Sequence, residues 1–317
     1  MLFSIIITCH DQREFIADAV SSALLLRAQD VEIIVVDDAS TDGSQIILGR
    51  YGNETRLLFL EKNLGACAAR NRGASLATGR YLVFLDGDDA LLPWALDVYR
   101  NIALTKSPAM ILASMRWFRR ALPAVDPGET PQAMRLVEYL DYMSKDRPFG
   151  NSASALVIDR QCFQAVGGWP EELFPLEDQD LVIRLGDSGK TVQVLSPATI
   201  LHRAHPGNTV NSVAPFLHSL RQIIRRERMG RYPGGKERRL ERYGLLGGLV
   251  FFWAKRAVKC GLCAEALKLV AHGWQMALVG ATRRVQAVLC GQRPCEALAV
   301  AVSTLARETP LGAASKL

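Results

Sequence analysis

Short runs of aliphatic residues alternate along the chain with stretches in which apolar positions recur at helical spacing. The runs at 3–8, 31–36 and 81–85 are mainly apolar, which is typical of strands buried on both faces of a parallel sheet. Helical patterns occupy residues 14–26 and 65–77 between them. This alternation predicts an α/β fold, in which a mostly parallel sheet is flanked by helices.

Polar residues follow the three predicted strands, at residues 8–11, 37–38 and 86–89. Ligands of such sheets bind beyond the carboxyl ends of the strands. We therefore expect the three polar segments to converge on one cleft. Residues 119–148 are rich in proline, glycine and charge, and we expect them to form a loop over that cleft.

The pattern changes from about residue 219 to long amphipathic helices rich in arginine, so we place a domain boundary at 214. Residues 1–214 form the predicted α/β domain, with 20 Lys and Arg against 26 Asp and Glu, and residues 215–317 form a basic helical region, with 18 against 6. The basic region indicates an anionic partner, such as a membrane surface. A helical cap packed on the first domain, with a solvated arginine face, explains the same pattern. Nucleic acid is not favoured, because no finger, RNP-type or helix-turn-helix signature is present.

Several features bear on the compartment. The N-terminus has no basic region before its short apolar run, unlike a signal peptide. The longest apolar stretch of the basic region, 244–254, is shorter than the ~18 residues of a spanning helix. Seven cysteines are scattered, with no second pair to complete a zinc site at Cys260-x-x-Cys263, as expected in a reducing compartment. We predict a cytoplasmic protein with peripheral contact to the inner face of the membrane.

Three carboxylates follow the strand at 81–86. Asp86 and Asp88 are two positions apart, so both point the same way if the strand direction continues. Carboxylates this close repel one another unless a cation or a proton neutralises them, and hard oxygen ligands favour Mg²⁺ or Mn²⁺. Turn formation and helix capping are the structural alternative, but they explain one or two of the carboxylates and not all three, including Asp89.

Seven segments of residues 1–214 together resemble a known family. They are a first strand ending at Thr8 before an acidic residue, VVDDASTDGS (35–44), NLGACAARNRG (63–73), FLDGDD (84–89), VGGWPEEL (166–173), EDQDLVIRL (177–185) and HPGNT (205–209). In this order they resemble a family 2 glycosyltransferase with the GT-A, Rossmann-like fold. The resemblance implies an enzyme that transfers a sugar, with inversion, from a nucleotide-sugar donor to a hydroxyl of a glycan or lipid-linked acceptor. A divalent cation, Mn²⁺ or Mg²⁺, is expected to hold the diphosphate, and the product is expected to be a polysaccharide or cell-envelope glycan.

The resemblance also implies roles on the donor side. Thr8 and Asp11 would border the nucleotide base, and Asp38 would accept a hydrogen bond from a base N–H. An Asx-type turn is the structural alternative for Asp38 and its neighbour. Arg70 lies in a predicted helix of small residues, which favours close packing at the cleft and a contact from Arg70 to a phosphate. The alternative is a solvated surface arginine.

The metal site is implied by two segments. Asp86 and Asp88 would be the acidic pair of the DxD motif, with Asp86 on the ribose and Asp88 on the metal, and Asp89 is close enough to share either role. His205 resembles a late metal or diphosphate contact, and imidazole is a suitable ligand beside carboxylates.

The acceptor side is assigned to residues 169–178. A displacement by an acceptor hydroxyl needs a general base, and the resemblance implies Asp178, with Glu177 as a neighbour at the acceptor. An acidic first helical turn that complements the helix dipole is the structural alternative. Asp180 and Arg184 are four apart and are expected to pair along the helix. Trp169 offers an apolar face on which an acceptor sugar could stack.

Two other nucleotide-binding motifs are excluded. GDSGKT at 186–191 resembles the end of a P-loop, but position 184 is Arg and a helical pattern precedes it. No G-x-G-x-x-G follows the first strand. ATPase and dinucleotide oxidoreductase functions are therefore not expected.

Two further function classes stay open. A non-catalytic sugar-nucleotide-binding or scaffold protein would share the fold, although the intact DGDD and EDQD segments disfavour it. A nucleotidyltransferase would share the architecture and the metal. It would be expected to carry a glycine-rich loop after the first strand, where this chain has TCHDQREF at 8–15.

Overall fold

The structure is a computed structural model that describes residues 1–119, 121–123, 131, 133–140, 142 and 152–289. Within these residues, eight strands form one sheet in the order β3-β2-β1-β4-β9-β6-β10-β8. The strands are β1 (Phe3–Cys9), β2 (Val31–Asp37), β3 (Arg56–Phe59), β4 (Tyr81–Asp86), β6 (Met110–Leu112), β8 (Arg135–Tyr139), β9 (Leu156–Asp159) and β10 (Thr191–Ser196).

The sheet is mostly parallel on one side and mixed on the other. β3, β2, β1 and β4 pair in parallel, as do β6 and β10. β9 is antiparallel to both of its neighbours, and β8 is antiparallel to β10 at the edge. A smaller sheet in the order β5-β11-β7 contains β5 (Ala90–Leu91), β7 (Met115–Phe118) and β11 (Ile200–Arg203).

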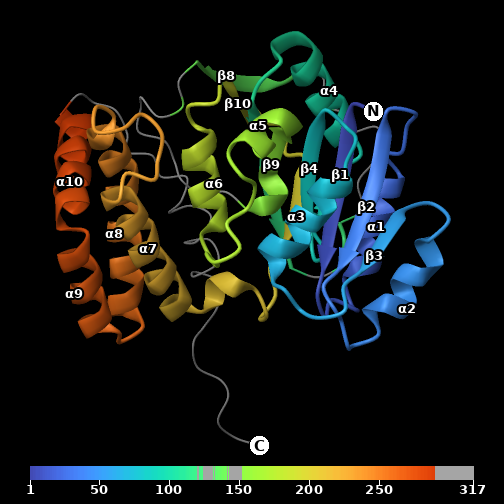
Figure 1. Ribbon diagram of the computed structural model, residues 1–317, viewed down its shortest axis with the longest axis horizontal. Coiled ribbons are helices and arrows are strands. Elements are labelled where there is room, and N and C mark those ends of the chain that lie inside the picture. Colours follow the sequence, from blue (N-terminus) through green and yellow to red (C-terminus); the bar gives the residue numbers. More distant parts are fainter. Residues whose placement is uncertain (120, 124–130, 132, 141, 143–151, 290–317) are drawn as a thin grey trace, which may run out of the picture.

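Helices cover both faces of the sheet (Figure 1). Side chains of β1 alternate between two cores: Ile5 and Ile7 belong to one and Ile6 to the other. This is the two-residue period of a strand buried on both sides. The first core includes residues of α1 (Ile16–Leu24), α2 (Ser44–Leu48) and α4 (Ala95–Lys106). The second includes residues of α3 (Ala66–Leu76), α5 (Arg160–Ala165) and α6 (Glu177–Leu185). The predicted fold class is confirmed.

Helix α3 packs very closely on the sheet. A Cβ atom at Gly73 would lie 2.4 Å from Cγ2 of Ile6 in β1, so a larger residue there would push the helix away from the strand. The close packing expected from the small residues of this helix is therefore confirmed.

The C-terminal part of the described chain is helical, as predicted. It contains α7 (Val213–Arg228), α8 (Arg239–Lys259), α9 (Cys263–His272) and α10 (Trp274–Leu289), which lie beside α6 in Figure 1. Leu220 of α7 and Leu246 of α8 share one hydrophobic cluster with Leu181 of α6. The helices thus pack on the α/β part of the molecule, as the cap alternative expects. The boundary at 214 lies in the first turn of α7 and stays a prediction.

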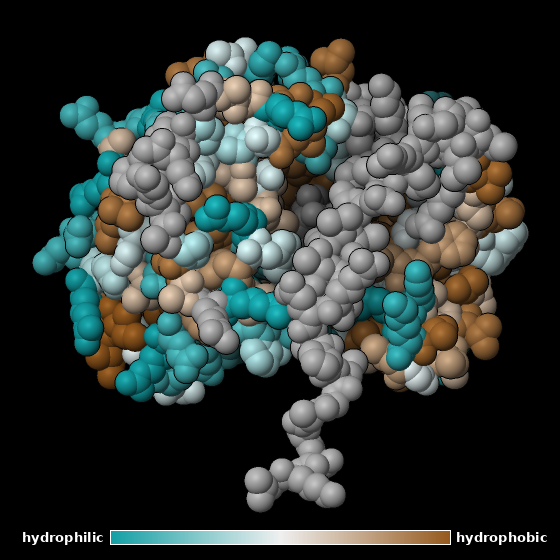
Figure 2. All heavy atoms as spheres, turned by 180° about the vertical axis from the view of Figure 1, so that it is seen from behind, coloured by the Kyte–Doolittle hydropathy of each residue, from teal (hydrophilic) through white to brown (hydrophobic). Residues whose placement is uncertain are grey.

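The reverse face of the molecule mixes polar and apolar side chains, with hydrophobic ones recurring along the edge formed by the C-terminal helices (Figure 2). No helix within the described ranges combines the length and the apolar character needed to cross a membrane.

Most of the predicted loop at 119–148 lies outside the described residues. Its described part contains β8, which pairs with β10 from Thr191 to Ser196. The expectation of a continuous loop was wrong at this point, because the edge of the sheet provides backbone partners for a strand that is not itself buried on both sides.

Candidate active site

The first two strands and β4 end side by side (Figure 1), so the predicted convergence of the polar segments is confirmed. Thr8 is the register partner of Asp86, and the backbone N–H of Gly87 donates to the carbonyl of Thr8 over 2.9 Å. A Cβ at Gly87 would lie 2.9 Å from that same oxygen. Glycine therefore allows the tight turn that carries Asp86 and Asp88.

Asp86, Asp88 and Asp89 bring carboxylate oxygens within 4.8 Å of one another, the one such group of potential metal ligands found in the described part of the chain. Oδ2 of Asp88 also lies 2.9 Å from Nε2 of His205. Two ligands at right angles, each about 2.1 Å from one octahedral ion, lie about 3.0 Å apart. Asp88 and His205 therefore fit two positions of a Mg²⁺ or Mn²⁺ coordination sphere.

Asp89 has a structural position instead of an open one. It is 0% exposed, and its Oδ2 accepts from Oγ of Ser154 at 2.6 Å and contacts Nδ1 of His202 at 2.9 Å. Its Oδ1 accepts from the backbone N–H of Arg203 at 3.0 Å. The burial of Asp89 raises the pKa of its carboxyl group. Both oxygens tie the turn after β4 to Ser154 and β11, and the predicted contact of Asp89 with ribose or metal stays a prediction.

Arg70 is an internal cation. It is 4% exposed, and it donates to Asp86 Oδ1 at 2.7 Å and to Glu177 Oε1 at 2.9 Å. Burial alone would lower the pKa of Arg70, but the two carboxylates outweigh burial and raise it. Arg70 is thus not a solvated surface arginine. Glu177 correspondingly contacts Arg70; the phosphate contact of Arg70 and the acceptor contact of Glu177 stay predictions.

Asp178 follows at the start of α6 and is 8% exposed. Burial raises the pKa of its carboxyl group to about 7, and the neighbouring Glu177 adds to the rise, while hydrogen bonds from Gln179 oppose it. These bonds run from the Gln179 backbone N–H at 2.8 Å and from its Nε2 at 3.1 Å. A carboxyl group that titrates near pH 7 is suited to proton transfer. The predicted pairing of Asp180 with Arg184 is confirmed, at 2.7 Å.

Trp169 does not present an open ring. It is 2% exposed, packs edge-on against Phe84 with centroids 5.1 Å apart, and lies 4.8 Å below the guanidinium carbon of Arg70. Both neighbours cover the ring in this arrangement, and the predicted stacking of an acceptor sugar on Trp169 stays a prediction.

Asp38 closes the loop before α3. Its two carboxylate oxygens accept from the backbone N–H groups of Leu64 and Gly65, each at 2.8 Å, and the residue is 2% exposed. Each oxygen thus already accepts one backbone hydrogen bond, and the predicted contact of Asp38 with a base stays a prediction. The structural alternative, an Asx-type turn, resembles what is seen, because the Asp38 side chain accepts from backbone N–H groups. These groups belong to the loop before α3 and not to the turn that contains Asp38.

The remaining donor-side residues lie on the loop after β1. Thr8 is buried at the end of the strand. Asp11 accepts from the backbone N–H of Thr41 at 2.7 Å. His10, which the sequence did not single out, bridges the carbonyl of Asp38 at 2.8 Å and the side chain of Asn63 at 2.7 Å. The sequence signal for His10 was its position directly after β1, between the predicted site residues Thr8 and Asp11.

A cavity of ≈ 560 Å³ adjoins His205. The Phe15 and His205 rings are tilted at 40° with their centroids 4.8 Å apart, and the guanidinium carbon of Arg203 lies 4.8 Å from the Phe15 ring centroid. Arg203 also pairs with Asp18 at 2.6 Å. A cation, an imidazole and an aromatic ring therefore line the cavity next to the fitted metal position.

Comparison with known proteins agrees with this geometry. Residues 4–117 match the family model described as Glycosyl transferase family 2. The putative teichuronic acid biosynthesis glycosyltransferase TuaG of Bacillus subtilis (strain 168) is 42% identical over 91 residues, 28% of this chain and 36% of that protein. The UDP-Glc:alpha-D-GlcNAc-diphosphoundecaprenol beta-1,3-glucosyltransferase WfaP of Escherichia coli is 39% identical over 90 residues, 28% of this chain and 36% of that protein. The chain thus spans about a third of the length of these relatives.

Solved structures share the fold. Residues covering 78% of this chain superpose on 70% of S. aureus TarS in complex with UDP, with a TM-score of 0.59 and 19% identity. The mannosyltransferase PcManGT from Pyrobaculum calidifontis, in complex with GDP-Man and Mn²⁺, aligns over 97% of this chain and 81% of its own, with a TM-score of 0.54 and 16% identity. The architecture is therefore of the GT-A type.

Proposed function

Because residues 4–117 match the family model described as Glycosyl transferase family 2, we propose that this chain is a metal-dependent glycosyltransferase of that family. It transfers a sugar from a nucleotide-sugar donor to an acceptor hydroxyl, with inversion at the anomeric carbon. The donor lies over the ends of β1 and β4, beside Thr8, Asp11 and Asp86. Asp88 and His205 hold Mn²⁺ or Mg²⁺.

One observation carries this proposal: Arg70 joins the two acidic segments. Its guanidinium contacts Asp86 of the DGDD turn at 2.7 Å and Glu177 of α6 at 2.9 Å. These residues are 91 positions apart in sequence, yet one buried side chain spans them. The fitted metal position and Asp178 therefore border the same centre, as a displacement reaction requires.

Asp178 has the role of general base. Its carboxylate takes the proton of the acceptor hydroxyl while the hydroxyl oxygen forms a bond to the anomeric carbon and the bond to the diphosphate oxygen breaks. The pKa of about 7 leaves a substantial fraction of Asp178 ionised at neutral pH. When bound, the cation at Asp88 and His205 supplies Lewis-acid stabilisation of the departing diphosphate. Arg70 holds Asp86 and Glu177 in place.

The acceptor belongs to cell-envelope glycan assembly in this proposal. Support comes from two relatives, whose names refer to teichuronic acid biosynthesis and to a diphosphoundecaprenol-linked substrate. The excess of 18 basic over 6 acidic residues in 215–317 supports peripheral contact with an anionic membrane surface.

A transfer assay tests the proposal. The protein is incubated with UDP-, GDP- and dTDP-sugars, with Mn²⁺ or with a chelator, and nucleotide release is measured in the presence of glycan acceptors. We expect release with one nucleotide and only with metal, and a product whose anomeric configuration, read by NMR, is opposite to that of the donor. Retained configuration, or release unaffected by the chelator, would contradict the proposed mechanism.

A further inference from the structure

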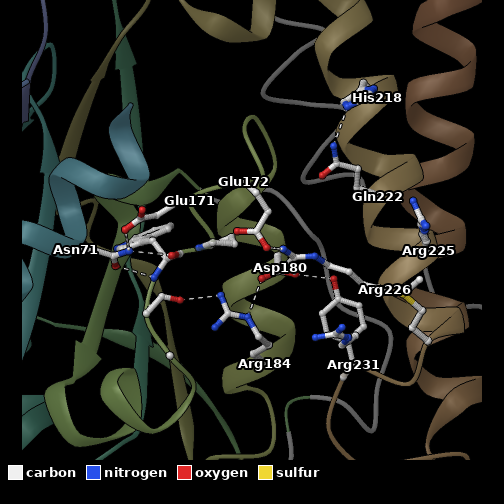
Figure 3. Close-up of a pocket in the computed structure, with 16 residues that line it drawn as sticks. Asn71, Glu171, Glu172, Asp180, Arg184, His218, Gln222, Arg225, Arg226 and Arg231 are labelled. Atoms are coloured by element: carbon white, nitrogen blue, oxygen red, sulfur yellow. Dashed lines mark hydrogen bonds and ion pairs between the residues drawn. The ribbon is translucent and has the colours of Figure 1, made fainter. Parts of the chain in front are cut away.

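A second and larger cavity, of ≈ 850 Å³, lies between α6 and α7 (Figure 3). Its volume is within the range of small-molecule sites, roughly 300–1,000 Å³. The fitted metal position is not part of it, since neither Asp88 nor His205 is among its lining residues. The two sites are adjacent: Trp169 is among the residues that line the cavity, and the centroid of its buried ring lies 4.8 Å from the guanidinium carbon of Arg70.

One face of α7 forms the far wall. His218, Gln222, Arg225 and Arg226 line the cavity. Gln222 is four residues from both His218 and Arg226 and three from Arg225, which places all four on the same side of the helix. The apolar residues of α7 face the hydrophobic core instead. The polar face of α7 is therefore turned toward α6 and the α3 side of the cavity (Figure 3).

The floor of the cavity is an internally neutralised network. Asp180 accepts from Arg184 at 2.7 Å, from Arg226 at 2.8 Å and from the Tyr232 hydroxyl at 2.7 Å. Arg226 also contacts Glu172. These two arginines and two carboxylates balance one another, so the floor is pre-organised and carries little net charge.

Two arginines of the cavity wall have no side-chain partner among the described residues. Arg225 and Arg231 are exposed, and the structure gives neither side chain a hydrogen bond or an ion pair within its described residues; Figure 3 accordingly draws no dashed line to them. Glu171, which has no cationic partner in the described part of the chain, lies on the opposite wall, held by Asn71 at 3.1 Å.

The unpaired guanidinium groups of Arg225 and Arg231 determine which ligand the cavity can bind. Unpaired guanidinium groups prefer phosphate, which they bind through two parallel hydrogen bonds. The cavity thus offers an excess of donors and positive charge on the α7 side.

We propose that this cavity binds a phosphate or diphosphate group of the acceptor, with Arg225 and Arg231 as its ligands. The inference rests on the proposed function and adds the acceptor class to it. Glu171 on the opposite wall accepts from sugar hydroxyls of the same ligand. Because Trp169 borders both the cavity and Arg70, an acceptor held here has its glycan next to α6, the helix that carries Asp178.

Calorimetric titration with inorganic pyrophosphate, in the absence of divalent metal, tests the site itself. The double variant Arg225→Gln/Arg231→Gln removes both unpaired cations, and Arg27→Gln/Arg50→Gln removes two exposed arginines that do not line the cavity. We expect at least about 10-fold weaker binding in the first variant and wild-type binding in the second. Equal affinity in all three proteins, or no binding by the wild type, would overturn the proposal.

Transfer kinetics identify the source of the phosphate. The assay compares a prenyl-diphosphate-linked glycan, a soluble glycan with phosphodiester groups and a neutral glycan. In Arg225→Gln/Arg231→Gln, KM for the phosphorylated acceptor that is used should rise about 10-fold or more, while KM for the donor and kcat stay unchanged. A loss of pyrophosphate binding without any change in acceptor KM would overturn the acceptor assignment. Failure of every acceptor with the wild type would count against the proposed function, whereas the pyrophosphate titration tests the cavity independently.

Discussion

Asp178 is a carboxyl group whose surroundings oppose its ionisation. It lies in the first turn of α6, where burial and the charge of Glu177 raise its pKa to about 7. Exposed aspartates titrate near pH 3.9, so they are nearly always ionised and weakly basic at neutral pH. The environment of Asp178, and not its residue type, therefore makes it the best candidate for proton transfer in this site.

The rate should consequently depend on pH near neutrality. A base with a raised pKa is protonated and inactive below that pKa, so kcat/KM should rise about tenfold per pH unit below pH 7 and level off above it. Because Asp178 interacts with Glu177, the apparent pKa belongs to the pair. The pH profile of kcat/KM at fixed Mn²⁺ measures this. A rate that stays level down to pH 5 would remove Asp178 from the role of base.

Asp88 is the residue on which metal dependence should rest. Asp88→Asn keeps the shape of the side chain but removes the charge beside His205. We expect Mn²⁺-dependent binding of the nucleotide-sugar to weaken about 10-fold or more. Asp97→Asn, an exposed aspartate on α4, is the matched control and should bind normally. Titration of Mn²⁺ into each variant with donor present distinguishes them, and an unchanged Asp88→Asn would show that the metal is held elsewhere.

At the residue scale the sequence predicted which side chains gather but not what covers them. The carboxylates of the DGDD turn and the Asp180–Arg184 pair follow from strand ends and helical spacing. Asp89 is buried against β11, and Arg70 is buried against Trp169 in the chain that precedes α6. Both segments are more than 70 positions away in sequence from Asp89 or Arg70. Such long-range packing leaves no local pattern.

At the scale of elements, helix α3 depends on a cap that lies outside it. Asp38 after β2 accepts from the backbone N–H groups of Leu64 and Gly65 just before the helix. The first N–H groups of a helix have no partner within it, and this carboxylate supplies one from another loop. The position of Arg70 on α3 is therefore set in part by Asp38.

Replacement of Asp38 should destabilise the fold. Asp38→Ala leaves the backbone N–H of Leu64 without its acceptor and that of Gly65 with Asn63 Oδ1 alone, and we expect a loss of about 1–2 kcal/mol in the free energy of unfolding. Asp38→Asn keeps one acceptor oxygen and should lose less. Urea denaturation followed by circular dichroism gives both values, with Asp97→Ala as a surface control. Equal stability of Asp38→Ala and the wild type would refute the capping role.

Strands with continuous apolar runs, such as β1, and helices of small residues, such as α3, could be predicted, because local sequence patterns indicate how they pack. Strand β8 could not. Its sequence, RLVEY, lies within a stretch rich in proline and charge, and an edge strand needs a neighbour's backbone more than it needs burial.

At the scale of the whole molecule, the C-terminal helices combine packing on the α/β part with an exposed apolar edge. Leu267, Trp274, Leu278 and Val285 of α9 and α10 are all more than half exposed. The last three fall on one side of α10, at spacings of four and seven. An apolar edge on a region with a large positive charge is suited to an anionic bilayer surface.

Charge placed on that edge should weaken membrane association. Trp274→Glu/Leu278→Glu is expected to reduce co-sedimentation with vesicles that contain anionic lipid by about 10-fold, since two apolar contacts are lost and two like charges are added. Leu104→Glu, at an exposed position of α4, should associate as the wild type does. Undiminished association of the double variant would favour the cap as the sole role of these helices.

The role of Asp178 as general base is tested most directly by measuring donor binding and sugar transfer separately in Asp178→Asn. The variant keeps the size of the side chain and should bind the nucleotide-sugar with Mn²⁺ as the wild type does, measured by calorimetry, while transfer to the acceptor falls by at least about 100-fold. This result would establish Asp178 as the base that acts on the acceptor. Loss of donor binding, or transfer at the wild-type rate, would contradict the assignment of Asp178 as the general base.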